Sequence, residues 1–305
     1  MYRAPSGGGF IGFRFKVRGP ARVLKNTDIL YLGVNAWDSI VQRPQHLARG
    51  LSENNRVLYV DPSAFSVFTS LRLSFRGTGR GSSRRPGLRR LSGSLFVFTP
   101  PPLLPFSLRS LSLNAVNARI VARMLARVFV TLRFRPELLW VSSPLGWPMV
   151  EQIRTGRVCY DCRDNFAAFY PDRRGVLLGR QEARLLKRAD VVFATERQLA
   201  DRCAARNRNV HLVPNAVHPR FLEPTQAPCP TSLSGLPRPV VGYVGALDLW
   251  IDFRLLRYLA EARPGWSFVL IGPGRQERNL AGIPNIHCLG PRAHADLPAF
   301  LDHFD

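Results

Sequence analysis

The stretch from Val240 to Gly274 limits most strongly how this chain can fold. Two short apolar runs, 240–244 and 267–271, have the length of buried strands. Between them, apolar residues recur at helical spacing after Asp252, a residue type that is favoured at a helix N-cap. The pattern predicts a β-α-β unit, with two parallel strands and a right-handed crossover.

Glycine follows both predicted strands, at Gly245 and then at Gly272 and Gly274. Open parallel sheets bind ligands at the carboxyl ends of their strands, where glycine lets the backbone approach a phosphate. The N-terminus of the following helix adds N–H groups. We interpret these glycines as a candidate nucleotide or diphosphate site. The alternative is a structural β-α-β unit with glycine turns, because this unit is common.

Strand-like and helix-like segments also alternate before this unit, which predicts a parallel α/β sheet with helices on both faces. The predicted strands are residues 29–34, 56–61, 95–99, 137–142, 157–161, 190–195 and 210–214. The predicted helices are residues 43–54, 107–133, 144–153, 175–188 and 196–206. Residues 75–90, rich in Gly, Ser and Arg, are predicted to form a loop.

The length of 305 residues suits two domains. We expect a basic, poorly ordered tail at 1–27, a first domain at 28–214, a proline-rich linker at 215–238 and a second domain at 239–305. The second domain has only about three predicted strands, the last at 286–289, and then the start of a helix at 297–304. We therefore expect it to be incomplete and the chain to be a fragment.

Positive charge is concentrated in the first half of the chain. The sequence has 43 Lys and Arg against 21 Asp and Glu, a net charge of +22, and it has no acidic residue between Asp61 and Glu137. In the predicted helix 107–133, one face carries five arginines: Arg109, Arg119, Arg123, Arg127 and Arg133. The opposite, inner face carries Val121, Leu125, Val128 and Leu132. The arginine face suits an anionic membrane surface, or it is the solvated side of a helix packed on the sheet. Nucleic-acid binding is disfavoured, because the basic stretches lack interleaved aromatic residues and known reader motifs.

The five cysteines are scattered, and nothing in their use requires an oxidising compartment. Cys159 and Cys162 form one C-x-x-C pair without a second pair at zinc spacing, so we expect buried thiols and no bound metal. No secretory signal and no apolar run of membrane-spanning length are found. We expect a cytoplasmic protein, with peripheral attachment to the inner face of the plasma membrane as a further hypothesis.

Five short motifs resemble, in order, those of group 1 family glycosyltransferases that build bacterial cell-surface polysaccharides. They are WD at 37–38 followed by QRPQHL at 42–47, YDCRDNF at 160–166, VPNAV at 213–217, GYVG at 242–245 and LIGP at 270–273. The resemblance runs from about residue 28 to the end. It implies the GT-B fold, an α/β architecture of two Rossmann-like parallel-sheet domains, of which the second is incomplete here. It also implies transfer of a sugar from a nucleotide-sugar donor, without another cofactor, to a lipid-linked or polysaccharide acceptor.

On the donor side, the resemblance assigns the diphosphate to the backbone at Gly245, Gly272 and Gly274, with Arg275. The loop 246–251 lacks the Arg and Lys that many family members place there, so Arg254 or Arg275 would have to serve. The family's acidic segment that holds the donor would lie beyond residue 305. An alternative is therefore a catalytically incomplete fragment that acts as an acceptor-binding or membrane-binding module.

On the acceptor side, transfer requires a base for the acceptor hydroxyl. His46 and Asp164 are the two candidates, each against a structural role as a hydrogen-bonding or turn residue. Trp37 and Arg43 are predicted to bind the acceptor. For Arg43 two roles remain open: it holds an acceptor phosphate, or it pairs with Asp38.

Overall fold

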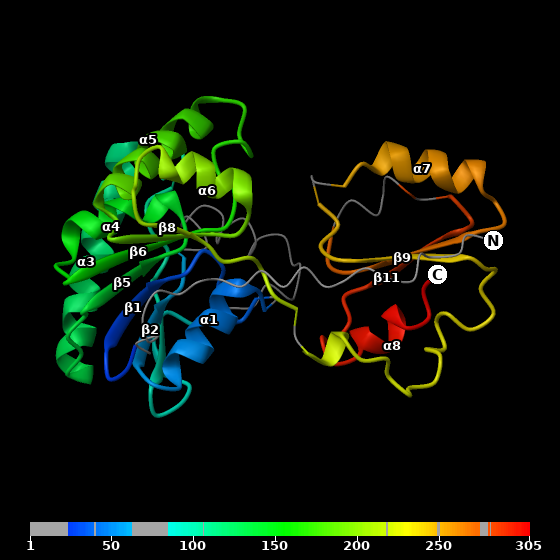
Figure 1. Cartoon of the computed structure of the whole chain (residues 1–305), viewed down its shortest axis with the longest axis horizontal. Helices are drawn as coiled ribbons and strands as arrows, with labels where there is room; N and C mark the ends of the chain where they lie inside the picture. Colours follow the sequence, from blue (N-terminus) through cyan, green and yellow to red (C-terminus); the bar gives the residue numbers. More distant parts are fainter. Residues whose placement is uncertain are drawn as a thin grey trace. The chain divides into compact units, whose positions relative to one another are not determined.

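The computed structural model describes residues 24–39, 41–62, 85–105, 107–217, 219–248, 251–274, 280 and 282–305. The chain divides into two compact units, Met1–Asn215 and Ala216–Asp305 (Figure 1). Arg275, most of the predicted tail and residues 75–84 of the predicted loop lie outside the described residues.

The first unit contains an eight-stranded sheet in the order β3-β4-β2-β1-β5-β6-β7-β8. All neighbouring strands are parallel except β3, which is antiparallel to β4. The strands are β1 (Asp28–Leu32), β2 (Arg56–Val60), β3 (Gly87–Arg90), β4 (Leu95–Thr99), β5 (Leu138–Val141), β6 (Arg157–Cys162), β7 (Val191–Ala194) and β8 (Val210–Leu212). Residues 87–90 were expected in a loop. They form β3 because a short turn, in which Leu91 and Ser92 donate to the carbonyl of Leu95, returns the chain along β4.

Helices cover both faces of this sheet, as predicted. They are α1 (Arg43–Ser52), α3 (Leu111–Leu132), α4 (Trp147–Gln152), which follows the short helix η1 (Pro144–Gly146), α5 (Arg173–Arg188) and α6 (Arg197–Ala204). Buried side chains of α3 to α6 share one core with the sheet, whereas α1 packs on the other face (Figure 1). Of the predicted inner residues of α3, Val121, Leu125 and Val128 are buried and Leu132 is partly buried. The five arginines of the predicted basic face are exposed, with Arg109 just before α3 and Arg133 just after it.

The second unit contains the β-α-β unit that the sequence predicts. Its three strands, β9 (Val240–Val244), β10 (Ser267–Ile271) and β11 (Ile286–Gly290), are parallel in the order β11-β10-β9. Helix α7 (Phe253–Ala262) connects β9 to β10, and the carboxylate of Asp252 caps it by accepting from the N–H groups of Arg254 and Leu255. A short helix, η2 (Pro219–Phe221), precedes β9, and α8 (Leu297–Leu301) follows β11.

Most of the segment that we interpreted as a linker packs on the second unit. Thr225 donates to the carboxylate of Asp302 through both its N–H and its hydroxyl. Leu233 is buried in one cluster with Val240 and Phe300. The boundary between the units therefore lies at the start of the segment, at Asn215 and Ala216.

Candidate functional site

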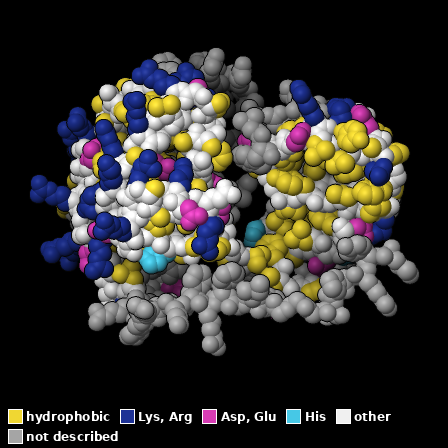
Figure 2. Space-filling model, turned by 45° about the horizontal axis from the view of Figure 1, so that its top comes forward, with side chains coloured by type: hydrophobic (Ala, Val, Ile, Leu, Met, Phe, Trp, Pro, Cys, Tyr) yellow, Lys and Arg dark blue, Asp and Glu magenta, His cyan; other side chains and the backbone are white. Residues whose placement is uncertain are grey.

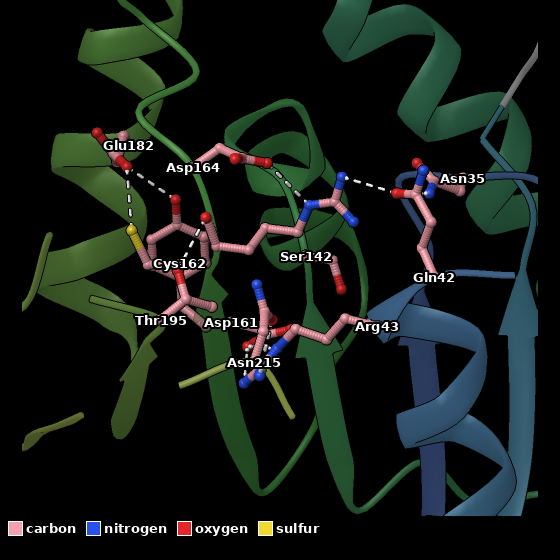
Figure 3. Close-up of polar contacts among 12 residues, drawn as sticks. Asn35, Gln42, Arg43, Ser142, Asp161, Cys162, Asp164, Glu182, Thr195 and Asn215 are labelled. Atoms are coloured by element: carbon pink, nitrogen blue, oxygen red, sulfur yellow. Dashed lines mark hydrogen bonds and ion pairs between the residues drawn. The ribbon is translucent and has the colours of Figure 1, made fainter. Parts of the chain in front are cut away.

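Polar side chains gather at the carboxyl ends of the central strands of the first sheet (Figure 3). Asn35 follows β1, Ser142 follows β5, Asp161 lies near the end of β6 and Thr195 follows β7. The topology brings these strands side by side, so residues distant in sequence share one edge. This is the edge at which open parallel sheets bind ligands.

Arg43, the first residue of α1, forms an ion pair with Asp161. Its Nε lies 3.1 and 3.2 Å from the two carboxylate oxygens, and its Nη2 lies 3.0 Å from Oδ1. The Asp161 side chain has no exposed surface, and burial raises the pKa of this carboxyl above its usual range while Arg43 opposes the shift. The third nitrogen of Arg43, Nη1, donates to Asn215 Oδ1 at 3.3 Å and to the Pro214 carbonyl at 3.4 Å.

The predicted pairing of Arg43 with Asp38 is wrong. Asp38 instead pairs with Arg89 at 2.7 Å, because β3 carries Arg89 to the loop after β1. The Arg43 side chain points toward Asp161 of β6 and toward Asn215 (Figure 3). Its proposed contact with an acceptor phosphate remains a prediction, and such a contact would share a guanidinium that already donates to three residues.

A second polar cluster lies beside the first and includes Asp164, Gln42 and Asn35 (Figure 3); Arg163 joins its members. Arg163 Nε donates to Asp164 Oδ2 at 3.0 Å, and Nη2 donates to Gln42 Oε1 at 3.4 Å. The same oxygen of Gln42 accepts from Asn35 Nδ2 at 2.5 Å. The Asp164 side chain is 38% exposed, so it is accessible to a ligand while Arg163 fixes its orientation. Amide and carboxylate groups in this arrangement are suited to bind sugar hydroxyls.

The loop that carries Arg163 is held from behind by a buried network. The hydroxyl of Thr195 donates to the Arg163 carbonyl at 2.9 Å. Glu182 of α5 accepts from the Tyr160 hydroxyl at 2.8 Å and from Arg202 Nη2 at 3.1 Å. Burial and the neighbouring carboxylate raise the pKa of the Tyr160 hydroxyl well above its usual range, which keeps it a proton donor.

His46 and Trp37 lie near these clusters but in different environments. His46 is exposed on α1, and within the described residues its ring makes no hydrogen bond. Trp37 is buried at 7% exposure, and its ring lies 5.1 Å from that of Tyr59. The backbone N–H of Trp37 donates to Asp61 Oδ1. This burial does not support the predicted contact of Trp37 with an acceptor. The ring instead holds the loop after β1 against the sheet.

A cavity of about 260 Å³ opens at the same edge, between the ends of β1, β2 and β4 and the inner face of α3. Its lining is mostly apolar, and the polar side chains in it are those of Asp61, Ser107, Asn114, Asn117 and Ser143. Both Asp61 oxygens are occupied, by the Trp37 N–H and the Thr99 hydroxyl, each at 2.7 Å. Among the described residues, no group of three or more His, Cys, Asp or Glu is arranged to hold a metal ion.

In the second unit, two glycines of the predicted donor site use their amides within the sheet. The N–H of Gly245 donates to the Ile271 carbonyl at 2.9 Å, and that of Gly272 donates to the Gly290 carbonyl at 3.0 Å. The prediction that both amides face a diphosphate is therefore corrected.

Gly272 and Gly274 allow two loops of the second unit to approach each other closely. Gly272 has φ +150°, and a Cβ there would lie 1.8 Å from the Gly245 carbonyl oxygen. Gly274 forms a parallel bridge with Leu247, and its Cβ would lie 2.5 Å from Leu247. Arg254 is exposed on α7. Donor contacts by Gly274 and Arg275 remain predictions.

The sequence analysis missed four residues of this edge as site residues: Asn35, Gln42, Asp161 and Arg163. Each lies at or just after a predicted strand end, or at the predicted start of the following helix. Their positions relative to the predicted strand ends and helix starts could therefore have identified them as candidate site residues. The contacts among them depend on strand order, which the sequence did not determine.

No family model matches this chain. A protein of Bacillus subtilis (strain 168), provisionally named the teichuronic acid biosynthesis glycosyltransferase TuaH, is 26% identical over 185 residues. The match covers 55% of this chain and 46% of that relative, so this chain spans about half the length of the relative it matches.

Solved structures show the fold. Sucrose-phosphate synthase from Thermosynechococcus elongatus has a TM-score of 0.66 at 12% identity, covering 92% of this chain and 74% of its own. Anabaena HepE in complex with UDP and glucose has a TM-score of 0.54 at 16% identity, covering 92% and 73%. These likenesses confirm the predicted α/β fold class of GT-B type and the predicted resemblance to glycosyltransferases.

Proposed function

We propose that this chain functions as a glycosyltransferase that moves a sugar from a nucleotide-sugar donor to a lipid-linked or cell-surface polysaccharide acceptor. The observation that carries the proposal is the match to a relative named for teichuronic acid biosynthesis, in a chain with the fold of a UDP-bound structure. The polar edge of the first sheet supports an acceptor site. It presents carboxylate, amide and guanidinium groups from the ends of β1 and β6 and from the start of α1.

Asp164 is the better placed of the two candidate bases. Arg163 fixes its carboxylate at 3.0 Å, the loop is held from behind through Thr195, and the side chain remains partly exposed. A positioned carboxylate can accept the acceptor hydroxyl proton as that oxygen attacks the sugar. His46 is the second candidate, because its exposed ring lies on the helix that begins at the same edge.

The proposal is tested by incubating the protein with a panel of UDP-, GDP-, ADP- and dTDP-sugars and lipid-linked saccharide acceptors. Release of the nucleoside diphosphate and glycosylation of the acceptor are measured together, and nucleotide binding is measured by calorimetry. We expect acceptor-dependent release with one nucleotide. Asp164→Asn is expected to reduce kcat by about 10²-fold or more, and His46→Ala is expected to change it little.

Binding of an acceptor without nucleotide binding or turnover would favour the alternative, an acceptor-binding module. If neither nucleotide nor acceptor binds, the proposed activity is refuted. A large loss with His46→Ala and none with Asp164→Asn would reverse the assignment of the base.

We further propose that the basic face of α3 attaches the protein to an anionic membrane surface. Its arginines are exposed, and Val116 and Val130 are exposed on the same side of the helix, at 37% and 79%. Figure 2 shows Lys and Arg side chains (dark blue) spread over the first unit. Apolar side chains among arginines combine burial in the headgroup region with attraction to anionic lipids. Within the described residues, no helix is long and apolar enough to cross a membrane.

Co-sedimentation with vesicles tests this attachment. Neutral phosphatidylcholine vesicles are compared with vesicles that also contain phosphatidylglycerol, at low and at high salt. The test variant replaces three exposed arginines of α3, Arg119, Arg123 and Arg127, by Glu. The matched control replaces three exposed arginines of α5 at the same spacing, Arg180, Arg184 and Arg188, by Glu.

We expect binding to anionic vesicles only, with release by salt. The α3 variant should lose binding, and the α5 variant should keep it. Equal loss in both variants would show that total charge attracts the protein and would refute a docking face on α3.

A further inference from the structure

The chain leaves the first unit through a segment with few contacts of its own. The N–H of Val213 donates to the Ala194 carbonyl at 2.8 Å, directly after β8. Residues 213–217 are exposed, and the boundary between the two units follows Asn215. In the described part of the chain, the side-chain hydrogen bonds to Pro214 and Asn215 come from Arg43.

Arg43 is itself held rigidly. It begins α1, its side chain is 13% exposed, and its Nε and Nη2 are fixed by the fully buried Asp161. The planar guanidinium has a fixed fork geometry, so pairing two of its nitrogens also determines where the third one points. Here Nη1 donates to the Pro214 carbonyl and to Asn215 Oδ1; Figure 3 shows Asn215 beside the Arg43 guanidinium.

We infer that Arg43 is a positioning residue that anchors the start of the connection between the two units. Asp161 orients Arg43, and Arg43 holds Asn215, the last residue of the first unit. The anchor fixes the point and direction in which the chain leaves the acceptor-side sheet. This restricts the arrangements open to the second unit. Its importance for sugar transfer rests on the proposed function, because donor and acceptor must be aligned for reaction.

Two variants separate the anchor from the ion pair. Asn215→Ala removes the side-chain acceptor and leaves the Arg43–Asp161 pair intact. Arg43→Lys keeps the positive charge, but its single amine cannot join Asp161 and Asn215 in the fixed geometry of the guanidinium. Arg89→Lys is the matched control, because Arg89 also pairs with an aspartate of the first unit, Asp38, in an exposed ion pair.

The distance distribution between the units is measured by double electron–electron resonance on the whole chain. The exposed Cys288 carries one spin label, and Ser112→Cys, on the exposed side of α3, carries the other in a Cys229→Ser background. The remaining three cysteines are buried and should not react. One lost hydrogen bond is expected to raise the population of detached arrangements about five-fold, seen as a broader distribution.

We expect broadening for Asn215→Ala and for Arg43→Lys, and none for Arg89→Lys. An unchanged distance distribution in Asn215→Ala overturns the inference. This result alone is sufficient, even if Arg43→Lys fails to fold. Equal broadening in the Arg89→Lys control overturns it as well. The readout is a distance, so the result is independent of whether the chain transfers sugar.

Discussion

Replacement of Arg43 by Met tests the electrostatics of the first unit. The change leaves the Asp161 carboxylate without its cation in a site with no exposed surface. Removing one partner of a buried ion pair costs about 3–5 kcal/mol of the free energy of unfolding. We expect about 3 kcal/mol, the lower end, because the Arg43 side chain is 13% exposed.

The penalty should depend on pH in a defined direction. Burial already raises the pKa of Asp161, and loss of Arg43, which lowers it, raises the pKa further. A carboxyl whose pKa is higher in the folded than in the unfolded state binds its proton more tightly when folded. It therefore destabilises the fold when ionised, and this cost falls as the pH drops through the folded pKa. The difference in the free energy of unfolding between Arg43→Met and the parent protein should therefore be larger at pH 8 than at pH 5.

Urea unfolding followed by tryptophan fluorescence measures this difference. Of the five tryptophans, Trp250 and Trp266 belong to the second unit, so replacing both by Phe restricts the signal to the first unit. A double variant, Arg43→Met with Asp161→Leu, removes both charges and should be much less destabilised than the sum of the two single variants. The same penalty at both pH values, or additive effects, would refute this reasoning.

Two further perturbations probe particular contacts. Gly272→Ala should destabilise the second unit by more than about 3 kcal/mol in thermal unfolding, because its Cβ would lie 1.8 Å from the Gly245 carbonyl oxygen. Gly265→Ala is the control, because a Cβ there meets no atom within 4 Å. Equal destabilisation by the two variants would contradict the steric argument. Tyr160→Phe should lower the free energy of unfolding by about 1–3 kcal/mol, since the buried hydroxyl donates to Glu182 at 2.8 Å, and no change in urea unfolding would show that this bond contributes nothing.

The predicted elements of the first unit followed from periodicity and agree closely with the structure. The outward arginines and the inward Val121, Leu125 and Val128 of α3 illustrate this, because a helix repeat assigns each residue to a face without knowledge of its neighbours. Strand β3 was missed for the opposite reason. A short edge strand with two arginines has no apolar alternation, and it forms only because β4 is beside it.

The candidate site was predicted less completely than the fold. The sequence placed Arg43 and Asp164 at the carboxyl edge of the first sheet, but it could not identify the residues to which they hydrogen-bond. Arg43 meets Asp161, 118 residues away, because β6 lies two strands from β1 in the sheet. Trp37 was predicted to bind the acceptor, yet its ring packs against Tyr59 and is buried.

Local sequence patterns were enough to predict the α/β architecture, the β-α-β unit at Val240–Gly274 and the basic face of one long helix. These depend on local periodicity, capping and turn residues, which act over a few positions along the chain. The three-dimensional fold was needed to show which polar groups meet at the sheet edge and that the amides of Gly245 and Gly272 are used within the sheet. Such pairings depend on strand order and register, because hydrogen bonds across a sheet join residues that the sequence keeps far apart.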